Sequence, residues 1–304
     1  MSAPRIALTG ATGFIGRAVL RALQGSGADV VTIGRQAVDG VRAEHCRADL
    51  LRDDPEEIFG RVRATHLLHL AWYAEPGLYW RAPVNLDWVA ASLRLFRAFA
   101  ASGGTRAVLA GSCAEYDWVE GPLNETRSAI RPATLYGAAK AHLTDLLQRA
   151  APDMGLSFAS GRIFFPFGPD ERSERLLGTL IKAGVEGTTA MLSAGTQRRD
   201  FIHVDDLASG LLALLHSDVE GPVNIGSGVA LPVRRFVEIA IEGAPWPISV
   251  EFGARPLAPG EPVEVVADMS RLRDEVGFSP SATVEDRIRD AMRVACLAAG
   301  KAVA

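Results

Sequence analysis

Short apolar runs alternate with longer segments of helical spacing along the first half of the chain. Strands that alternate with helices in this way are joined by right-handed crossovers and form a parallel sheet with helices on both faces. The pattern therefore predicts an α/β fold built on a doubly wound parallel sheet. The expected strands lie at 5–9, 29–33, 65–70, 106–110 and 156–161, and the expected helices at 14–24, 84–102 and 134–150.

Prolines become frequent after residue 165 and divide the rest of the chain into shorter units. Pro166, Pro169 and Pro222 are the first of this series. Proline interrupts helices and central strands, so this part favours shorter elements than the first half. We expect a first domain over residues 1–165 and a smaller C-terminal α/β lobe over 166–304, from which the chain crosses back to the first domain.

Composition and charge narrow the range of partners. The formal net charge of −4, without a basic tract, gives no electrostatic reason to expect nucleic acid. No apolar segment approaches the ~20 residues that span a bilayer, and the N-terminus lacks the pattern of a leader. Cys46, Cys113 and Cys296 are scattered, which fits neither a disulfide framework nor a zinc site. These features predict a soluble, cytoplasmic protein without metal or membrane contacts.

Three glycines interrupt the first apolar run, in the sequence TGATGFIG. Each glycine weakens regular structure by roughly 0.5–1 kcal/mol relative to alanine, so another role must retain them. They follow a strand and open a helix, where a tight turn directs backbone N–H groups and the helix N-terminus at a pyrophosphate. This position predicts a Rossmann-like dinucleotide-binding domain. The residues assigned to it here are Gly10, Thr12, Gly13, Phe14, Ile15 and Gly16.

The sequence YGAAK places Tyr136 and Lys140 four residues apart on one helix face. A free tyrosine has a pKa near 10, and an adjacent ammonium favours its phenolate, which makes the phenol a usable proton donor. Ser112, at the end of the fourth expected strand, could hydrogen-bond the same substrate oxygen. We therefore assign Ser112, Tyr136 and Lys140 as the catalytic residues, with Tyr136 and Lys140 also facing the cofactor.

Several motifs in order resemble the short-chain dehydrogenase/reductase superfamily, within it the extended branch that acts on nucleotide sugars. They are TGATGFIG, HLA at 69–71, GSCAEY at 111–116, YGAAK at 136–140 and RRDFIHVDDLA at 198–208, so the resemblance covers nearly the whole chain. It implies that Leu70 and Ala71 line the cofactor and that Asp49 and Leu50 contact the adenine. It also implies a nucleotide-sugar substrate.

The resemblance further implies substrate-binding residues, with two departures. Arg199 and Arg255 correspond to the arginines that bind the nucleotide diphosphate, which suits their fork geometry. Phe165 stands where the family has an asparagine that helps to fix the substrate. Tyr73 belongs to a group of aromatics near the expected sugar pocket, although core packing or a subunit interface explains such aromatics equally well.

The second departure concerns dehydration. Nucleotide-sugar 4,6-dehydratases carry an Asp-Glu pair after the catalytic residue, and Cys113 and Ala114 stand there in this chain. Neither side chain can perform that acid–base work. Glu115 comes one position later, and on a strand successive side chains face opposite ways. Dehydration is therefore not expected, and Cys113 is assigned to the substrate pocket.

The end of the second expected strand bears on the choice of cofactor. A carboxylate there would bind the ribose 2′-hydroxyl of NAD, whereas an arginine can pair with the 2′-phosphate of NADP. The chain has Gly34 and Arg35 and no acid, although Asp39 follows shortly. The sequence predicts NADP (NADPH), with NAD as the alternative.

Three functions are compatible with these residues. The first is an NADPH-dependent reduction of a keto group, at C4, on a nucleotide-activated deoxysugar. The second is a nucleotide-sugar C4 epimerase that retains NAD. The third is a non-catalytic NAD(P)-sensing protein, which has no need of the complete Ser-Tyr-Lys set.

Two expected helices carry more apolar residues than one sheet-facing stripe requires. A dimer interface, common in the family that the chain resembles, would bury the excess, so a homodimer is predicted. The residues are Leu86, Val89, Leu93, Leu95, Phe96 and Phe99 on the first helix and Leu143, Leu146 and Leu147 on the second.

Overall fold

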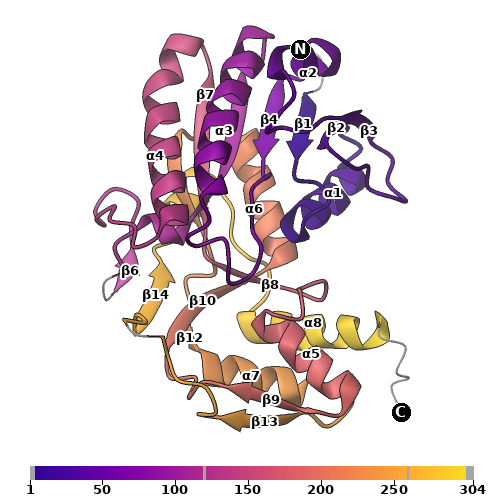
Figure 1. Cartoon of the computed structure of the whole chain (residues 1–304), viewed down its shortest axis with the longest axis vertical. Helices are drawn as coiled ribbons and strands as arrows, with labels where there is room; N and C mark the ends of the chain where they lie inside the picture. The colour runs from indigo at the N-terminus through magenta and orange to yellow at the C-terminus, as the bar shows by residue number, and fades with distance from the viewer. Residues whose placement is uncertain (1–3, 119–120, 259, 299–304) are drawn as a thin grey trace.

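The computed structural model describes residues 4–118, 121–258 and 260–298. A seven-stranded sheet dominates it, with the strand order β11-β7-β5-β4-β1-β2-β3 and every neighbouring pair parallel (Figure 1). The α/β fold with a doubly wound parallel sheet is thereby confirmed. The strands are β1 (Arg5–Thr9), β2 (Asp29–Gly34), β3 (Glu44–Arg47), β4 (His66–His69), β5 (Arg106–Ser112), β7 (Ser157–Ile163) and β11 (Gly221–Ile225).

Helices cover both faces of this sheet. One face carries α1 (Phe14–Ser26) and α6 (Val204–His216), and the other carries α2 (Pro55–Val62), α3 (Val84–Ala101) and α4 (Leu135–Ala150). The strand order reverses between β1 and β4, because β2 lies on one side of β1 and β4 on the other. In doubly wound sheets the carboxyl ends of the two strands at such a reversal form the ligand crevice.

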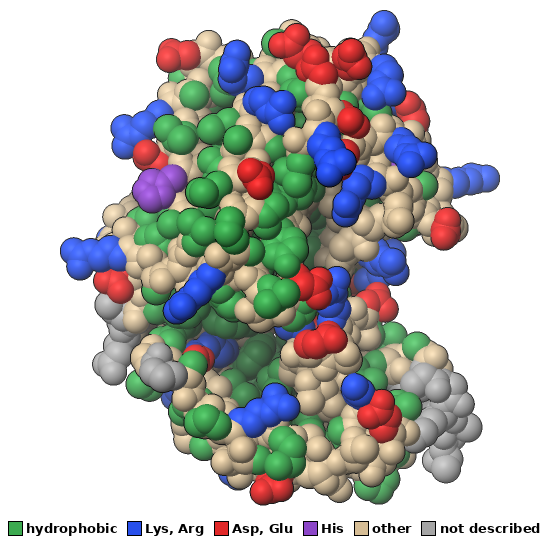
Figure 2. All heavy atoms as spheres, in the orientation of Figure 1, with side chains coloured by type: hydrophobic (Ala, Val, Ile, Leu, Met, Phe, Trp, Pro, Cys, Tyr) green, Lys and Arg blue, Asp and Glu red, His purple; other side chains and the backbone are tan. Residues whose placement is uncertain are grey.

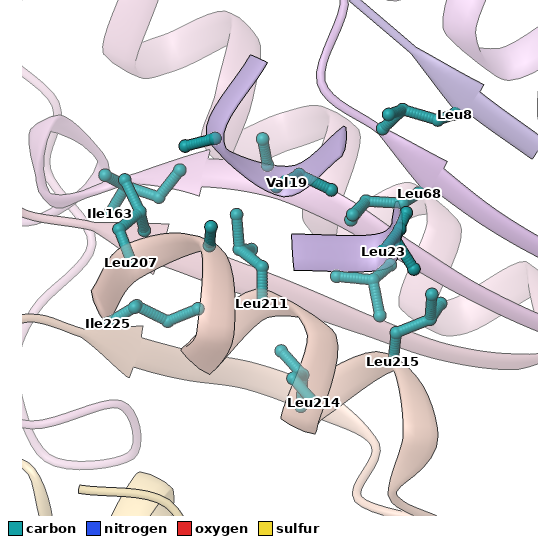
Figure 3. Close-up of a cluster of buried hydrophobic side chains, with 14 of the residues drawn as sticks. Leu8, Val19, Leu23, Leu68, Ile163, Leu207, Leu211, Leu214, Leu215 and Ile225 are labelled. Carbon is teal, nitrogen blue, oxygen red and sulfur yellow. The ribbon is translucent and has the colours of Figure 1, made fainter. Parts of the chain in front are cut away.

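The layer between α1, α6 and the sheet is packed with branched apolar side chains. Figure 3 shows Val19 and Leu23 of α1 next to Leu207, Leu211 and neighbouring leucines of α6, with Leu8, Leu68, Ile163 and Ile225 of the sheet alongside them. These side chains are almost completely removed from water. Because α6 belongs to the second half of the sequence, this layer joins the two halves of the chain.

A smaller lobe lies at one end of the large sheet (Figure 1). Its second sheet has the order β12-β10-β14-β6, with β8 paired to β10, and β9 pairs with β13. The strands are β6 (Pro122–Leu123), β8 (Phe165–Phe167), β9 (Thr189–Leu192), β10 (Arg198–His203), β12 (Ala230–Pro232), β13 (Ser249–Phe252) and β14 (Glu264–Ala267). The helices are α5 (Leu176–Glu186), α7 (Val233–Glu242) and α8 (Val284–Ala298).

The elements of the large sheet layer that were not expected from the sequence are β3, α2, α6 and β11. The strand β3 is only four residues long and reads EHCR, so it has no apolar run. The helix α2 contains Gly60, but Asp54 caps its start by accepting a hydrogen bond from the Glu56 amide at 3.0 Å. That cap, with Pro55 at the first helical position, was a readable start signal.

The division of the chain at residue 165 stays a prediction. The structure places α6 and β11, which follow that position, in the large sheet layer. An ion pair also joins the lobe to this layer, because Arg287 of α8 donates to Asp206 of α6 at 2.8 Å. Of the described helices, none is long and apolar enough to span a membrane.

Leu211 tests how much the α1–α6 layer contributes to stability. Leu211→Ala removes a fully buried side chain and is expected to lower the free energy of unfolding by about 2–5 kcal/mol. Leu257→Ala, at an exposed leucine, should change it by less than about 0.5 kcal/mol. Urea denaturation measures both variants, and equal losses would contradict this view of the core.

Candidate active site

The glycine loop lies at the reversal point of the sheet, and two of its glycines are sterically required. Gly10 has a φ of +72°, and a Cβ there would lie 2.7 Å from the Ala71 amide nitrogen. A Cβ on Gly16 would lie 2.1 Å from the Gly10 carbonyl oxygen. The loop therefore packs against the segment after β4 and against its own helix, leaving the α1 N-terminus open to a phosphate group.

Thr9 holds the ends of β1 and β4 together. Its Oγ1 accepts hydrogen bonds from the Leu70 and Ala71 amides at 3.1 and 3.2 Å, and lies 2.8 Å from His69 Nδ1. Since the hydroxyl already accepts two bonds, its own proton is directed to Nδ1, which leaves the ring proton on Nε2, 3.0 Å from Ser92 Oγ. Burial, with the nearby charge of Lys140, lowers the pKa of His69 to about 3, so the ring is neutral.

A buried carboxylate fixes the backbone of Ser112. Glu115 Oε1 accepts a hydrogen bond from the Ser112 amide at 2.9 Å, and Oε2 accepts one from Arg162 Nε at 2.8 Å. Residues 113–115 form a 3₁₀ turn, so the expectation that they continue the strand is wrong. The turn directs Glu115 back toward Ser112. Pairing with Arg162 compensates its burial.

The helix α4 brings Tyr136 to Ser112. Thr134 caps its start, accepting a bond from the Gly137 amide at 3.1 Å. A Cβ on Gly137 would lie 2.2 Å from the Ala114 carbonyl oxygen, so this glycine permits the close approach of the helix to the turn after β5. Burial raises the pKa of Tyr136, and a hydrogen bond with the Ser112 side chain opposes that rise.

Lys140 lies one turn further along α4 and is almost completely buried. Its Nζ donates to the Ala110 carbonyl oxygen at 2.8 Å and lies 3.7 Å from the centre of the Trp72 ring. Burial lowers the pKa of Lys140 to about 7, while Glu115 acts in the opposite direction. The ammonium is therefore close to its titration point at neutral pH.

Sequence reasoning missed Tyr79, which lies beside Tyr136, the expected proton donor. The Tyr79 and Tyr136 rings meet edge to face at 4.8 Å, and the Trp80 carbonyl accepts a hydrogen bond from the Tyr136 amide at 3.1 Å. Burial raises the pKa of Tyr79 to about 12, although Arg175 opposes the rise. The sequence could not predict this contact, because Tyr79 lies in a loop whose path is not predictable and about 57 residues of chain separate it from Tyr136.

Three of the expected substrate residues cluster beside Ser112. Cys113 is buried, and burial raises the pKa of its thiol, so it is neutral. The Arg199 guanidinium lies 5.5 Å from the Phe165 ring and acts electrostatically on Cys113. Arg199 also donates to the carboxylate of Glu261 and, at 3.0 Å, to the Pro262 carbonyl oxygen.

The other expected residues lie apart from this cluster. Arg255 is exposed beyond β13, where its amide donates to Leu192, and Tyr73 is half-exposed after β4. Arg35 is exposed at the carboxyl end of β2, and Asp49 and Leu50 follow the neighbouring β3. The expected cofactor residues thus share the carboxyl edge of the sheet. Their individual roles stay predictions.

The described residues contain no group of three or more His, Cys, Asp or Glu side chains that could hold a metal ion. Cys46 and Cys113 are free and buried, and the Cys296 side chain lies outside the described part. A glycine loop at a sheet reversal, with a Ser-Tyr pair and a buried lysine, defines a dinucleotide-dependent α/β enzyme.

The family comparison agrees with this class. A model of the NAD dependent epimerase/dehydratase family matches residues 6–226, and the chain belongs to that family. It is an NAD(P)-dependent enzyme of the extended short-chain dehydrogenase/reductase type, and the resemblance to the nucleotide-sugar branch is confirmed.

Relatives and solved structures align over almost the whole chain. UDP-glucose 4-epimerase of Azospirillum brasilense is 29% identical over 97% of this chain and 91% of the relative. The dTDP-6-deoxy-L-talose 4-dehydrogenase (NAD(P)(+)) of Kitasatospora kifunensis is 29% identical over 94% of each. MoeE5 in complex with UDP-glucose and NAD superimposes with a TM-score of 0.82 at 26% identity, covering 95% of this chain and 97% of the other.

Tyr136→Phe tests the assignment of the proton donor. We expect turnover to fall by ~10²–10⁴ while dinucleotide affinity and the fold stay nearly unchanged, because only the acid–base hydroxyl is removed. Steady-state kinetics and cofactor titration measure the two effects. Wild-type turnover in this variant would show that Tyr136 is not the donor.

Proposed function

We propose that this protein is an NADPH-dependent ketoreductase that reduces a keto group, at C4, on a nucleotide-activated deoxysugar. The observation that carries the proposal is Arg35, exposed at the carboxyl end of β2 where a carboxylate would select NAD. The 4-dehydrogenase relative, whose name includes NAD(P)(+), supports it. The free, buried Cys46 and Cys113 are compatible with a cytoplasmic location.

The residues present fit a dinucleotide. Gly10 and Gly16 leave a cradle that a side chain would fill, and the open N-terminus of α1 suits a pyrophosphate. When bound, the nicotinamide supplies the hydride. Tyr136 would donate a proton to the oxygen of the reduced carbonyl, and Ser112 would hydrogen-bond that oxygen. Lys140, one turn further along α4, would supply positive charge to this part of the site.

The nucleotide sugar would be anchored on the lobe side of Ser112. Arg199 lies against Phe165 there, and its guanidinium geometry suits a diphosphate. Glu261 now accepts from that guanidinium, so a bound diphosphate would compete with this carboxylate. Figure 2 shows a hollow between the large sheet layer and the lobe, where such a ligand would fit.

A nucleotide-sugar C4 epimerase with retained NAD is the second candidate. The Azospirillum relative is a UDP-glucose 4-epimerase, and a UDP-glucose 4-epimerase from Thermus thermophilus in complex with NAD has a TM-score of 0.83 at 25% identity over 95% of this chain and 98% of that chain. An epimerase regenerates its cofactor within each turnover and gains by holding it. A non-catalytic sensor is not favoured, because it would not need Ser112 beside Tyr136.

The two candidates differ in their need for added cofactor. A reductase should purify largely without dinucleotide and consume one NADPH for each 4-keto nucleotide sugar reduced. Arg35→Asp should lower kcat/KM for NADPH tenfold to a hundredfold and leave NADH use similar or improved, since a charge-assisted bond to the 2′-phosphate contributes roughly 1.5–3 kcal/mol.

The control for this variant is Arg63→Asp, at an exposed arginine before β4 on the opposite edge of the sheet, which should leave both cofactors unaffected. Absorbance at 340 nm follows the reaction, and mass spectrometry identifies any dinucleotide that copurifies. Stoichiometric NAD with C4 interconversion in the absence of reductant would establish the epimerase instead.

An exposed apolar surface over α3 and α4 supports a homodimer. Much of the apolar excess of these helices faces the sheet, including Phe96, Phe99 and Leu143. Leu86 and Leu146, however, are 59% and 48% exposed. Figure 2 shows hydrophobic side chains gathered over these helices. Continuous apolar surface of this kind marks a protein interface.

The double variant Leu86→Arg/Leu146→Arg should convert the protein from dimer to monomer, because it buries two charges in the proposed interface. Leu257→Arg, on the lobe, should remain dimeric. Sedimentation velocity at micromolar concentration measures the assembly. A wild-type protein that sediments only as a monomer would remove the proposal.

A further inference from the structure

The ammonium of Lys140 has an uncharged aromatic partner. Its Nζ lies 3.7 Å from the centre of the Trp72 ring, and the Ala110 carbonyl accepts one of its hydrogen bonds. A buried ammonium loses most of its hydration, and one carbonyl satisfies only one of its three N–H groups. The face of an indole ring attracts a cation and compensates part of this loss.

Asn85 fixes the Trp72 ring in this position. It is fully buried, and its Oδ1 accepts a hydrogen bond from Trp72 Nε1 at 2.8 Å. Its Nδ2 donates to the carbonyl oxygens of Tyr79 and Ala82, both at 2.8 Å. One amide therefore ties the ring beneath Lys140 to the segment that meets Tyr136.

We propose that Trp72 is a positioning residue for Lys140, and that Asn85, in the first turn of α3, couples it to Tyr79 so that one segment, residues 72–85, orients both members of the Tyr136–Lys140 pair. This segment meets Tyr136 through the Tyr79 ring and the Trp80 carbonyl. Its catalytic consequence rests on the proposed function. The contact with Lys140 does not, and it can be measured without a substrate.

The charged groups around Lys140 determine in which direction its pKa should change when Trp72 is replaced. Glu115 favours the ammonium, and His69, with a pKa of about 3, is neutral above that pH. Tyr136, on the same helix, stays protonated at neutral pH because burial raises its pKa. The indole face favours the charged form of Lys140, so its removal should lower the pKa of Lys140 further below the present value of about 7.

A direct titration of Lys140 tests the proposal. The sequence has Lys140, Lys182 and Lys301 as its lysines, so protein labelled with ¹³C-lysine gives few side-chain signals. Lys182→Arg and Lys301→Arg assign them. Trp72→Leu should lower the pKa of Lys140 by about one unit, whereas Trp72→Phe, which keeps an aromatic face, should restore part of the difference.

Trp88→Leu is the matched control. Trp88 stacks on Trp72 at 5.9 Å between ring centres, so the variant removes a tryptophan of the same pair but leaves the ring under Lys140. The pKa of Lys140 should stay within about 0.2 of the wild-type value. An unchanged or raised pKa in Trp72→Leu, or equal shifts in Trp72→Leu and Trp88→Leu, would overturn the proposal.

The activity provides the second measurement. If Lys140 acts as its ammonium, the high-pH limb of the kcat profile should move down by about one pH unit in Trp72→Leu, with a smaller change in KM. If Trp72→Leu lowers the pKa of Lys140 but leaves the pH profile of kcat unchanged, the contact between Trp72 and Lys140 is supported and the role of Lys140 in the proposed function is rejected. The two proposals therefore fail separately.

Discussion

The close approach of the chain at the ends of β1 and β4 is the constraint on which the rest of the site depends. Gly10 lets the loop lie against the backbone of Leu70 and Ala71. Thr9 Oγ1 holds the two strand ends together by accepting hydrogen bonds from the amides of both residues. The reversal of strand order makes these two ends neighbours. Any side chain on Gly10 would separate them and displace α1, so the cradle for a dinucleotide and the packing of the sheet layer have the same origin.

The part of the site with the expected catalytic residues contains two buried charges, and each of them has partners that compensate its burial. Glu115 is shared between the Ser112 amide and Arg162, and Lys140 has the Ala110 carbonyl and the Trp72 ring. An uncompensated charge at either position would cost several kcal/mol. The partners of Lys140 differ in kind from those of Glu115, because neither carries a charge. Burial lowers the pKa of Lys140 to about 7, whereas Glu115 is paired with the permanent cation of Arg162.

The segment between β4 and α3 contacts both residues of the Tyr136–Lys140 pair, through Trp72 and Tyr79. The family model matches residues 6–226, a range that includes the sheet, the glycine loop and the helix α4. Trp72, Tyr79 and Asn85 form a local network on that frame. Both proposed functions would use Ser112, Tyr136 and Lys140, so the expected difference between them is how tightly cofactor and substrate are held around these residues.

Local features of the sequence determined the fold class and the main chemical groups. The alternation of apolar runs and helical spacing predicts β1, β2, β4, β5 and β7, and the glycine spacing and YGAAK predict the cofactor loop and the proton donor. Only the tertiary structure decided that Glu115 turns back to Ser112, that Tyr79 meets Tyr136, and that Arg199 is paired with Glu261. Periodicity depends on neighbours within a few residues. These contacts join side chains through turns and loops whose paths depend on what they pack against, and a local sequence pattern cannot predict those paths.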